Sequence, residues 1–126
     1  ITSNELEWIG SGTIEFMSPE LIMKKDTINN KSDIWNYGLL MYDLLTRLNS
    51  PFYNLSDRKI VQNIKKNIYN DESLSKNLLE KNMIFKFENK NKNITLKNNL
   101  LNIFSKCLKN NPEERMSISE IKNIIK

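Results

Sequence analysis

The sequence predicts a mainly α-helical domain in which five or six helices surround one buried central helix, Asp33 to Leu48. Three observations predict this class. Apolar residues recur at helical spacing in several segments, and capping residues or prolines mark where those segments begin and end. In addition, the segment "SDIWNYGLLMYDLLTRL" is apolar on nearly every face, which is typical of a helix enclosed by others.

The first twenty residues predict a loop followed by a short helix. Apolar spacing in residues 1–12 fits neither a helix nor a strand, so we expect an extended segment there. The stretch "GTIEFMSPE" ends on Ser18, a favoured N-cap, and on Pro19, which suits the first helical position. Glu20 then lies in the first turn, where the helix dipole favours a negative charge.

The central helix is expected to begin with Ser32 as its cap and to end at "NSPF", residues 49–52. Its main apolar stripe comprises Ile34, Gly38, Met41, Leu45 and Leu48. Trp35, Leu39, Leu40, Tyr42 and Leu44 cover other faces, so we expect a largely buried helix. Its apolar surface exceeds what the remaining helices of this chain can cover, so we also expect an exposed patch on it.

The rest of the chain predicts further helices and a pair of short strands. Ser56 begins a helix with an apolar stripe from Ile60 to Ile68, and a short helix is expected around residues 74–81. Two short strands, "MIFKF" and "ITL", are then predicted between residues 83 and 96. A helix with Leu100, Leu101, Phe104 and Leu108 facing inward follows, and Ser117 with Glu120 forms a capping box for the last helix.

Composition narrows the classes of function. The 126 residues and their 39% apolar content suit a single core, and no apolar run approaches the roughly 20 residues of a membrane span. There is no histidine and one cysteine, which excludes a disulfide framework and a Cys/His metal site and favours a reducing intracellular, cytoplasmic setting. Because Cys107 falls in a helical stripe, a buried structural thiol is favoured over a nucleophile. The net charge of +4 is spread along the chain and does not favour nucleic acid as a partner.

Only separated polar residues in apolar surroundings remain as candidates for a site. Among them are Glu20, Asp33 and Arg115. Spacing alone leaves two interpretations open for this set. The acids can simply favour helix N-termini and the arginine can be a surface charge, or the three can belong to a functional arrangement.

Three motifs in order resemble the large lobe of eukaryotic protein kinases of the serine/threonine type. They are "GTIEFMSPE", then "KSDIWNYGLLMYDLLT" with "SPF", then "CLKNNPEERMSISEI", and together they cover nearly the whole chain. The resemblance implies that residues 1–20 are the end of the activation segment and the substrate loop. Residues 21–126 would then be the helical subdomain, and the chain, which does not begin with methionine, is expected to be the C-terminal portion of a catalytic domain.

The resemblance also implies a role for individual residues. Gly12, Thr13 and Phe16 would belong to the substrate loop, with Thr13 near the catalytic aspartate and lysine. Glu20 would form a buried ion pair with Arg115, and Asp33 would accept backbone N–H groups of the catalytic loop. Trp35 and Gly38 match packing positions of the central helix, and family members are often phosphorylated at positions corresponding to Thr2, Ser3 and Ser11.

The chain lacks the motifs that contact nucleotide in this family. It has no Gly-rich loop, no His-Arg-Asp catalytic loop and no Asp-Phe-Gly metal motif, and phosphoryl transfer depends on such parts. The resemblance therefore implies a parent kinase that uses ATP and Mg²⁺, both bound by residues outside this chain, and a protein substrate. We expect the isolated chain to be inactive. The alternatives are a pseudokinase or helical interaction scaffold without catalysis, and, more distantly, a basic nucleic-acid binder.

Overall fold

The computed structural model describes residues 14–23, 30–48, 50–84 and 91–125. Within these ranges the chain forms only α-helices and short 3-10 helices, and no strand. In chain order they are η1 (Ile14–Phe16), α2 (Pro19–Ile22), α3 (Asn30–Thr46), α4 (Asp57–Lys65), η2 (Ile68–Asn70), α5 (Glu72–Asn82), α6 (Asn91–Cys107), η3 (Pro112–Glu114) and α7 (Ile118–Ile125). The predicted mainly helical class is confirmed.

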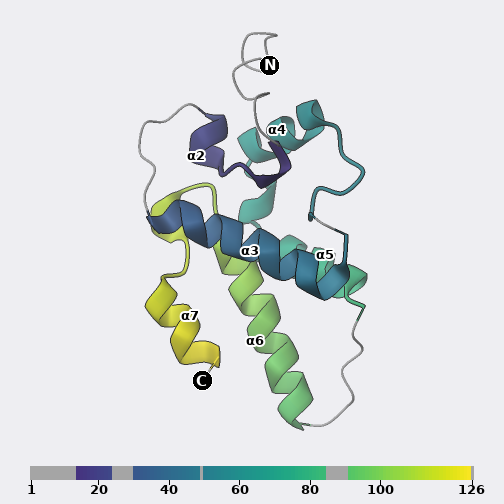
Figure 1. Cartoon of the computed structure of the whole chain (residues 1–126), viewed down its shortest axis with the longest axis vertical. Helices are drawn as coiled ribbons and strands as arrows, with labels where there is room; N and C mark the ends of the chain where they lie inside the picture. The colour runs from purple at the N-terminus through teal and green to yellow at the C-terminus, as the bar shows by residue number, and fades with distance from the viewer. Residues whose placement is uncertain (1–13, 24–29, 49, 85–90, 126) are drawn as a thin grey trace.

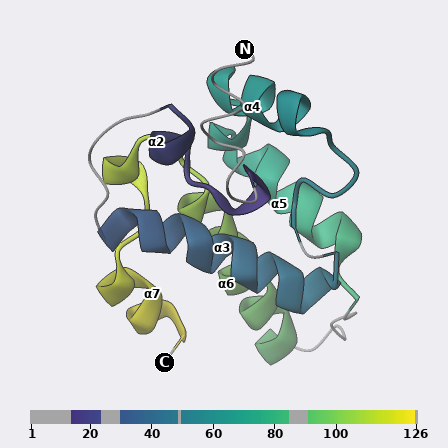
Figure 2. The same cartoon turned by 45° about the horizontal axis from the view of Figure 1, so that its top comes forward.

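Helix α3 is the axis of the fold. It crosses α6, while α2 and α4 lie on one side of it and α7 lies on the other (Figure 1; Figure 2). The core combines many aliphatic side chains with a few buried aromatic rings. Tyr42 of α3 packs against Phe104 of α6 with ring centroids 5.5 Å apart, and Phe52 lies between Trp35 and Tyr69, 6.4 and 5.0 Å from them.

The crossing of α3 and α6 depends on a glycine. A Cβ atom added at Gly38 would lie 2.7 Å from the Cβ atom of Cys107, which is closer than two carbon atoms can approach without movement. Gly38 therefore lets the two helix backbones approach closely. Cys107 is fully buried there, as the sequence predicts for a structural thiol.

Local capping signals are confirmed for two helices. The Ser56 hydroxyl accepts a hydrogen bond from the Lys59 backbone N–H at 3.2 Å and begins α4. Ser117 and Glu120 form the predicted capping box of α7, with reciprocal bonds of 3.1 and 3.3 Å between side chain and backbone.

The central helix differs from the prediction in its bounds, and part of its surface is exposed. It begins at Asn30, so Ser32 lies within its first turn and is not the cap, and it ends at Thr46. Leu40 and Leu44 are 56% and 66% exposed, so one face of the helix is open, in agreement with the expected exposed patch. Apolar character shows which residues suit burial, but it does not show which neighbours are present to bury them.

One predicted strand is wrong. Ile94–Leu96, "ITL", lies within α6, while the predicted helix around residues 74–81 is confirmed as α5. The sequence "MIFKF" lies partly outside the described residues. Ile94 and Leu96 are 40% and 47% exposed. An apolar alternation of three residues, with no strand beside it among the described residues, is too short to form a strand where the following residues favour a helix.

Candidate functional site

The short segment before and within α2 brings a carboxylate into the core. Ser18 occupies the N-cap position and Pro19 the first helical position, as predicted, but the Ser18 side chain makes no capping bond. Its hydroxyl is buried and has no hydrogen-bond partner in the part of the chain that the structure describes. The backbone turn is held instead by Leu21 and Ile22, whose N–H groups both donate to the Ser18 carbonyl at 3.1 Å. This turn points Glu20 inward, where the residue is 3% exposed.

Glu20 and Arg115 form a buried, bidentate ion pair across 95 positions of sequence. The Arg115 Nη2 atom donates to Glu20 Oε1 at 2.7 Å, and Nη1 donates to Oε2 at 2.8 Å. The two side chains are 2% and 0% exposed. This fork geometry is the strongest arrangement that an arginine and a carboxylate can adopt.

The remaining donors of Arg115 are also satisfied. Its Nε donates to the Lys109 carbonyl at 2.8 Å, Nη1 to the Lys31 carbonyl at 2.7 Å, and Nη2 to the Asn110 carbonyl at 3.4 Å. The guanidinium carbon lies 5.3 Å from the centre of the Trp35 ring, which adds a cation–π contact. Arg115 thus joins α2, the first turn of α3 and the turn that follows α6.

Two residues of this network were not predicted as partners. Ser32 donates its hydroxyl to Glu20 Oε2 at 2.7 Å, and the Lys31 ammonium donates to the Arg115 carbonyl at 2.9 Å. Ser32 directly precedes Asp33, where the helix was expected to begin, so Ser32 was interpreted as the helix cap. Its position next to the motif aspartate was the only local sign of a role, and no spacing rule links it to Glu20.

Hydrogen bonding decides the charge state of Glu20. Burial alone would raise the pKa of this carboxyl group, but the hydrogen bonds from Arg115 and Ser32 outweigh burial and hold the pKa below its usual value of 4.5. Glu20 is therefore ionised at neutral pH. The carboxylate serves as an anchor for the pair and is in no position to act as a general acid there.

The other residues singled out from the sequence add no hydrogen bond to this pair among the described residues, although the Trp35 ring contacts its guanidinium. Asp33 is exposed in the first turn of α3 and has no partner among the described residues. Trp35 and Gly38 are buried on the same helix. Phe16 is 47% exposed at the end of η1 and lines a hollow of about 360 Å³ with α3 residues, Leu40 among them.

Several predicted site residues lie outside the described residues. These are Gly12 and Thr13 of the expected substrate loop, and Thr2, Ser3 and Ser11, the expected phosphorylation sites. Phe16 is thus the member of the expected substrate loop that the structure places.

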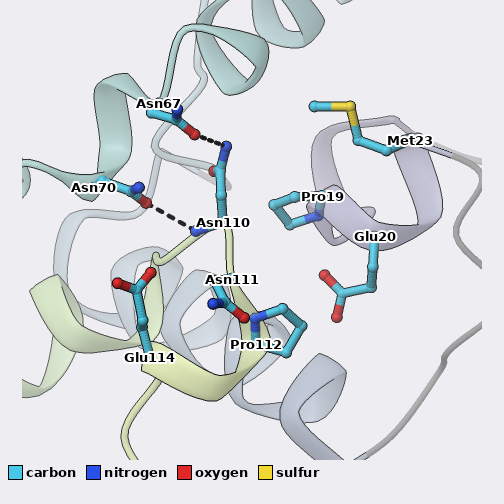
Figure 3. A pocket seen from close by; sticks show the side chains of 9 residues that line it. All are labelled: Pro19, Glu20, Met23, Asn67, Asn70, Asn110, Asn111, Pro112 and Glu114. Carbon is cyan, nitrogen blue, oxygen red and sulfur yellow. Dashed lines mark hydrogen bonds between the residues drawn. The ribbon is translucent and has the colours of Figure 1, made fainter.

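A surface cleft of about 440 Å³ lies beside the ion pair. Figure 3 shows Pro19 and Met23, at the two ends of α2, on one side of the cleft and Asn67 and Asn70 on the other. Asn110 bridges to both asparagines. Its Nδ2 donates to Asn67 Oδ1 at 2.6 Å and its backbone N–H donates to Asn70 Oδ1 at 2.8 Å.

No cluster of candidate metal ligands forms among the residues that the structure describes. Within ranges 14–23, 30–48, 50–84 and 91–125, no group of three acidic, histidine or cysteine side chains could hold a metal ion. Among these same residues, no helix is both long and apolar enough to cross a lipid bilayer.

Comparison with known proteins identifies related sequences. The protein kinase domain model matches residues 2–124 of the chain. Myosin light chain kinase 2 of Bos taurus is 40% identical over 70 residues, which is 55% of this chain and 11% of the relative. Mitogen-activated protein kinase kinase kinase dlk-1 of Caenorhabditis briggsae is 36% identical over 59 residues, 47% of this chain and 7% of the relative. Fibroblast growth factor receptor 1 of Dugesia japonica is 33% identical over 57 residues, which is 45% of this chain and 6% of the relative.

No solved structure matches the chain significantly. The matched segments therefore span about a tenth or less of these curated relatives.

Proposed function

The chain belongs to the protein kinase family, and from that premise we propose that it is the C-terminal part of a serine/threonine kinase catalytic domain. The parent transfers the γ-phosphoryl group of ATP to hydroxyl groups of a protein substrate. This part supplies the substrate loop and its helical support, while ATP and Mg²⁺ bind to residues outside it.

The observation that carries this proposal is the buried pair of Glu20 and Arg115. Glu20 closes the segment that begins at Gly12, and Arg115 stands just before α7. Because the pair is bidentate and nearly inaccessible to water, it fixes the end of the proposed substrate loop to the body of the domain. A loop held in this way can present a protein acceptor in a constant position, which is what phosphoryl transfer requires of it.

The exposed face of α3 supports a partial domain. Leu40 and Leu44 lie on this face, and Phe16 of the proposed loop lies beside Leu40. Asp33 is exposed in the first turn of the same helix, with its carboxylate free of described partners. We assign this face to contact with the preceding part of the catalytic domain, with Asp33 accepting backbone N–H groups of the catalytic loop.

Thr13 favours serine and threonine as acceptors. In the family resemblance, tyrosine-specific members usually carry a proline-bearing version of this loop, whereas residues 12–16 read "GTIEF" and contain no proline. Thr2, Ser3 and Ser11 are the positions where we propose that phosphorylation regulates the parent.

A binding module without catalysis is the second candidate function. The buried pair and the helical packing would serve a pseudokinase or an interaction scaffold equally well, because neither takes part in chemistry. The sequence before residue 1 discriminates the two candidates. A His-Arg-Asp catalytic loop and an Asp-Phe-Gly motif there support the enzyme, and their loss supports the scaffold.

The proposal that ATP and Mg²⁺ bind outside this chain is tested by comparing the isolated chain with the intact protein. We expect the intact protein to bind ATP with Mg²⁺ in a calorimetric titration and to label a generic protein substrate. The isolated chain should do neither. Saturable binding of ATP by the isolated chain at micromolar concentration would contradict the proposed mapping.

A further inference from the structure

The cleft beside α2 presents amide N–H groups in fixed orientations. Asn67 and Asn70 each use their side-chain oxygen to accept a hydrogen bond from Asn110, and Asn111 uses its oxygen to accept from the Glu113 backbone N–H at 3.1 Å. Because each side-chain oxygen accepts one of these hydrogen bonds, the amide orientation is fixed and the Nδ2 group is left as the donor. These three Nδ2 groups have no partner among the described residues, and all three asparagines line the cleft.

The rest of the lining consists of Asn110, whose buried Oδ1 has no partner among the described residues, three apolar residues and two glutamates. Pro19, Met23 and Pro112 contribute apolar surface. Glu114 is exposed, and its carboxylate has no partner among the described residues. The carboxylate of Glu20 also borders the cleft, but its charge is balanced by Arg115.

These groups match the chemistry of an extended protein segment with a basic side chain. Peptide carbonyl oxygens are acceptors for amide Nδ2 groups, and a lysine or arginine head is attracted to the Glu114 carboxylate. The aliphatic stem of such a side chain can cover the apolar surface of the two prolines and Met23. An anionic ligand fits poorly, because the one uncompensated charge of the lining is negative.

The position of the cleft favours a protein as its occupant. Pro19 lies three residues after Phe16, the last residue of the proposed substrate loop, so a protein held by that loop reaches the cleft easily. The choice of a protein as the occupant therefore rests on the proposed function of this loop. We propose that the cleft between α2 and the Asn110–Glu114 turn docks a basic segment of a partner protein, away from the phosphoryl-acceptor position.

The test measures peptide binding to the intact protein in the absence of ATP. Short acetylated peptides of alanine with a central arginine, norleucine or glutamate are titrated while the asparagine side-chain amide signals are followed by NMR. The arginine peptide should bind most tightly and shift the signals of Asn67, Asn70 and Asn111. Because no phosphoryl transfer is measured, a catalytically inactive parent would still bind, so failure of the proposed function does not produce the same result.

Matched variants separate the two kinds of contact. Glu114→Gln should weaken the arginine peptide about threefold to fivefold and leave the norleucine peptide unchanged, as expected for one exposed ion pair. The neighbouring carboxylate, Glu113, does not line the cleft, so Glu113→Gln is the control and should change neither peptide. Asn111→Ser keeps a capping oxygen for η3 and removes the Nδ2 group, so it should weaken both peptides about twofold to tenfold.

Three results would overturn the inference. One is equal binding of the arginine and norleucine peptides, and another is preference for the glutamate peptide. The third is the absence of any shift at millimolar concentration of all three peptides. Circular dichroism of each variant shows that a loss of binding is not a loss of folding.

Discussion

The ion pair of Glu20 and Arg115 makes a quantitative prediction about stability. Removal of one partner leaves the other charge buried, because the two side chains are 2% and 0% exposed. Breaking such a pair costs on the order of 3–5 kcal/mol of unfolding free energy, whereas a surface pair contributes about 1 kcal/mol or less. The two outcomes are far enough apart to distinguish in one experiment.

The structure also predicts which single change is worse. In Glu20→Ala the guanidinium loses two bonds but keeps three backbone carbonyls, those of Lys31, Lys109 and Asn110. In Arg115→Ala the carboxylate keeps the Ser32 hydroxyl and its own backbone N–H, and the three carbonyls lose the Arg115 donor. We therefore expect Glu20→Ala to lower the unfolding free energy by about 3 kcal/mol and Arg115→Ala to lower it by about 5 kcal/mol.

Urea unfolding of the intact protein, followed by far-ultraviolet circular dichroism, measures these losses. The double variant should lose less than the sum of the single variants, by about 0.5–3 kcal/mol, since the two residues are in direct contact. The exposed pair of Glu80 and Lys97, with side chains 48% and 32% exposed, is the matched control. Its alanine variants should each cost about 1 kcal/mol or less.

A conservative variant tests the geometry separately from the charge. Arg115→Lys retains the positive charge but has three donors in place of the planar fork, so it should still be clearly destabilising. Additive losses of less than about 1 kcal/mol for Glu20→Ala and Arg115→Ala would refute the reasoning, because both residues would then behave as ordinary surface charges.

Further predictions concern the helix crossing, the thiol, the pH response and the open face of α3. Gly38→Ala should destabilise the protein by about 1–3 kcal/mol because its new methyl group meets Cys107, although alanine is the better helix former; an unchanged urea midpoint would contradict this. Burial raises the pKa of Cys107 to about 12, so a maleimide at pH 8 should label this thiol only at urea concentrations that unfold the chain. Because the pKa of Glu20 is lower in the folded state, its contribution to stability is complete above pH 4.5 and is lost as the pH falls through the folded pKa; the Glu20→Gln variant should lack this component of acid unfolding. In the isolated chain the exposed Leu40 and Leu44 should cause dye binding and self-association, which a double serine variant should reduce in sedimentation experiments. A clean monomer of the unmodified isolated chain at high concentration would argue against that last expectation.

Local signals in the sequence were sufficient for the starts of α4 and α7. Ser56 and the Ser117–Glu120 box act within one turn of chain, so the residues that form each cap are also the residues that reveal it. Ser32 shows the limit of this reasoning. Its position before Asp33 resembles a cap, but the chain is already helical from Asn30, and the hydroxyl donates to a carboxylate twelve positions earlier.

Long-range features could not be derived from periodicity. Glu20 and Arg115 are 95 positions apart, and only the order of the three motifs suggested that they meet. Periodicity likewise did not identify the residues of the exposed patch on α3, because Leu40 and Leu44 have the same apolar character as their buried neighbours. The cleft was not predicted at all, since its asparagines come from separate turns and carry no common spacing.

The identity of the phosphorylated residue is the most direct test of the central claim, that the chain belongs to a serine/threonine kinase. The intact protein is incubated with radiolabelled ATP, Mg²⁺ and a protein substrate rich in serine, threonine and tyrosine, and the labelled amino acids are separated after hydrolysis. We expect label in phosphoserine and phosphothreonine, with the yield sharply reduced in the Glu20→Ala and Arg115→Ala variants. Label confined to phosphotyrosine, or no transfer from a correctly folded intact protein, would contradict the account.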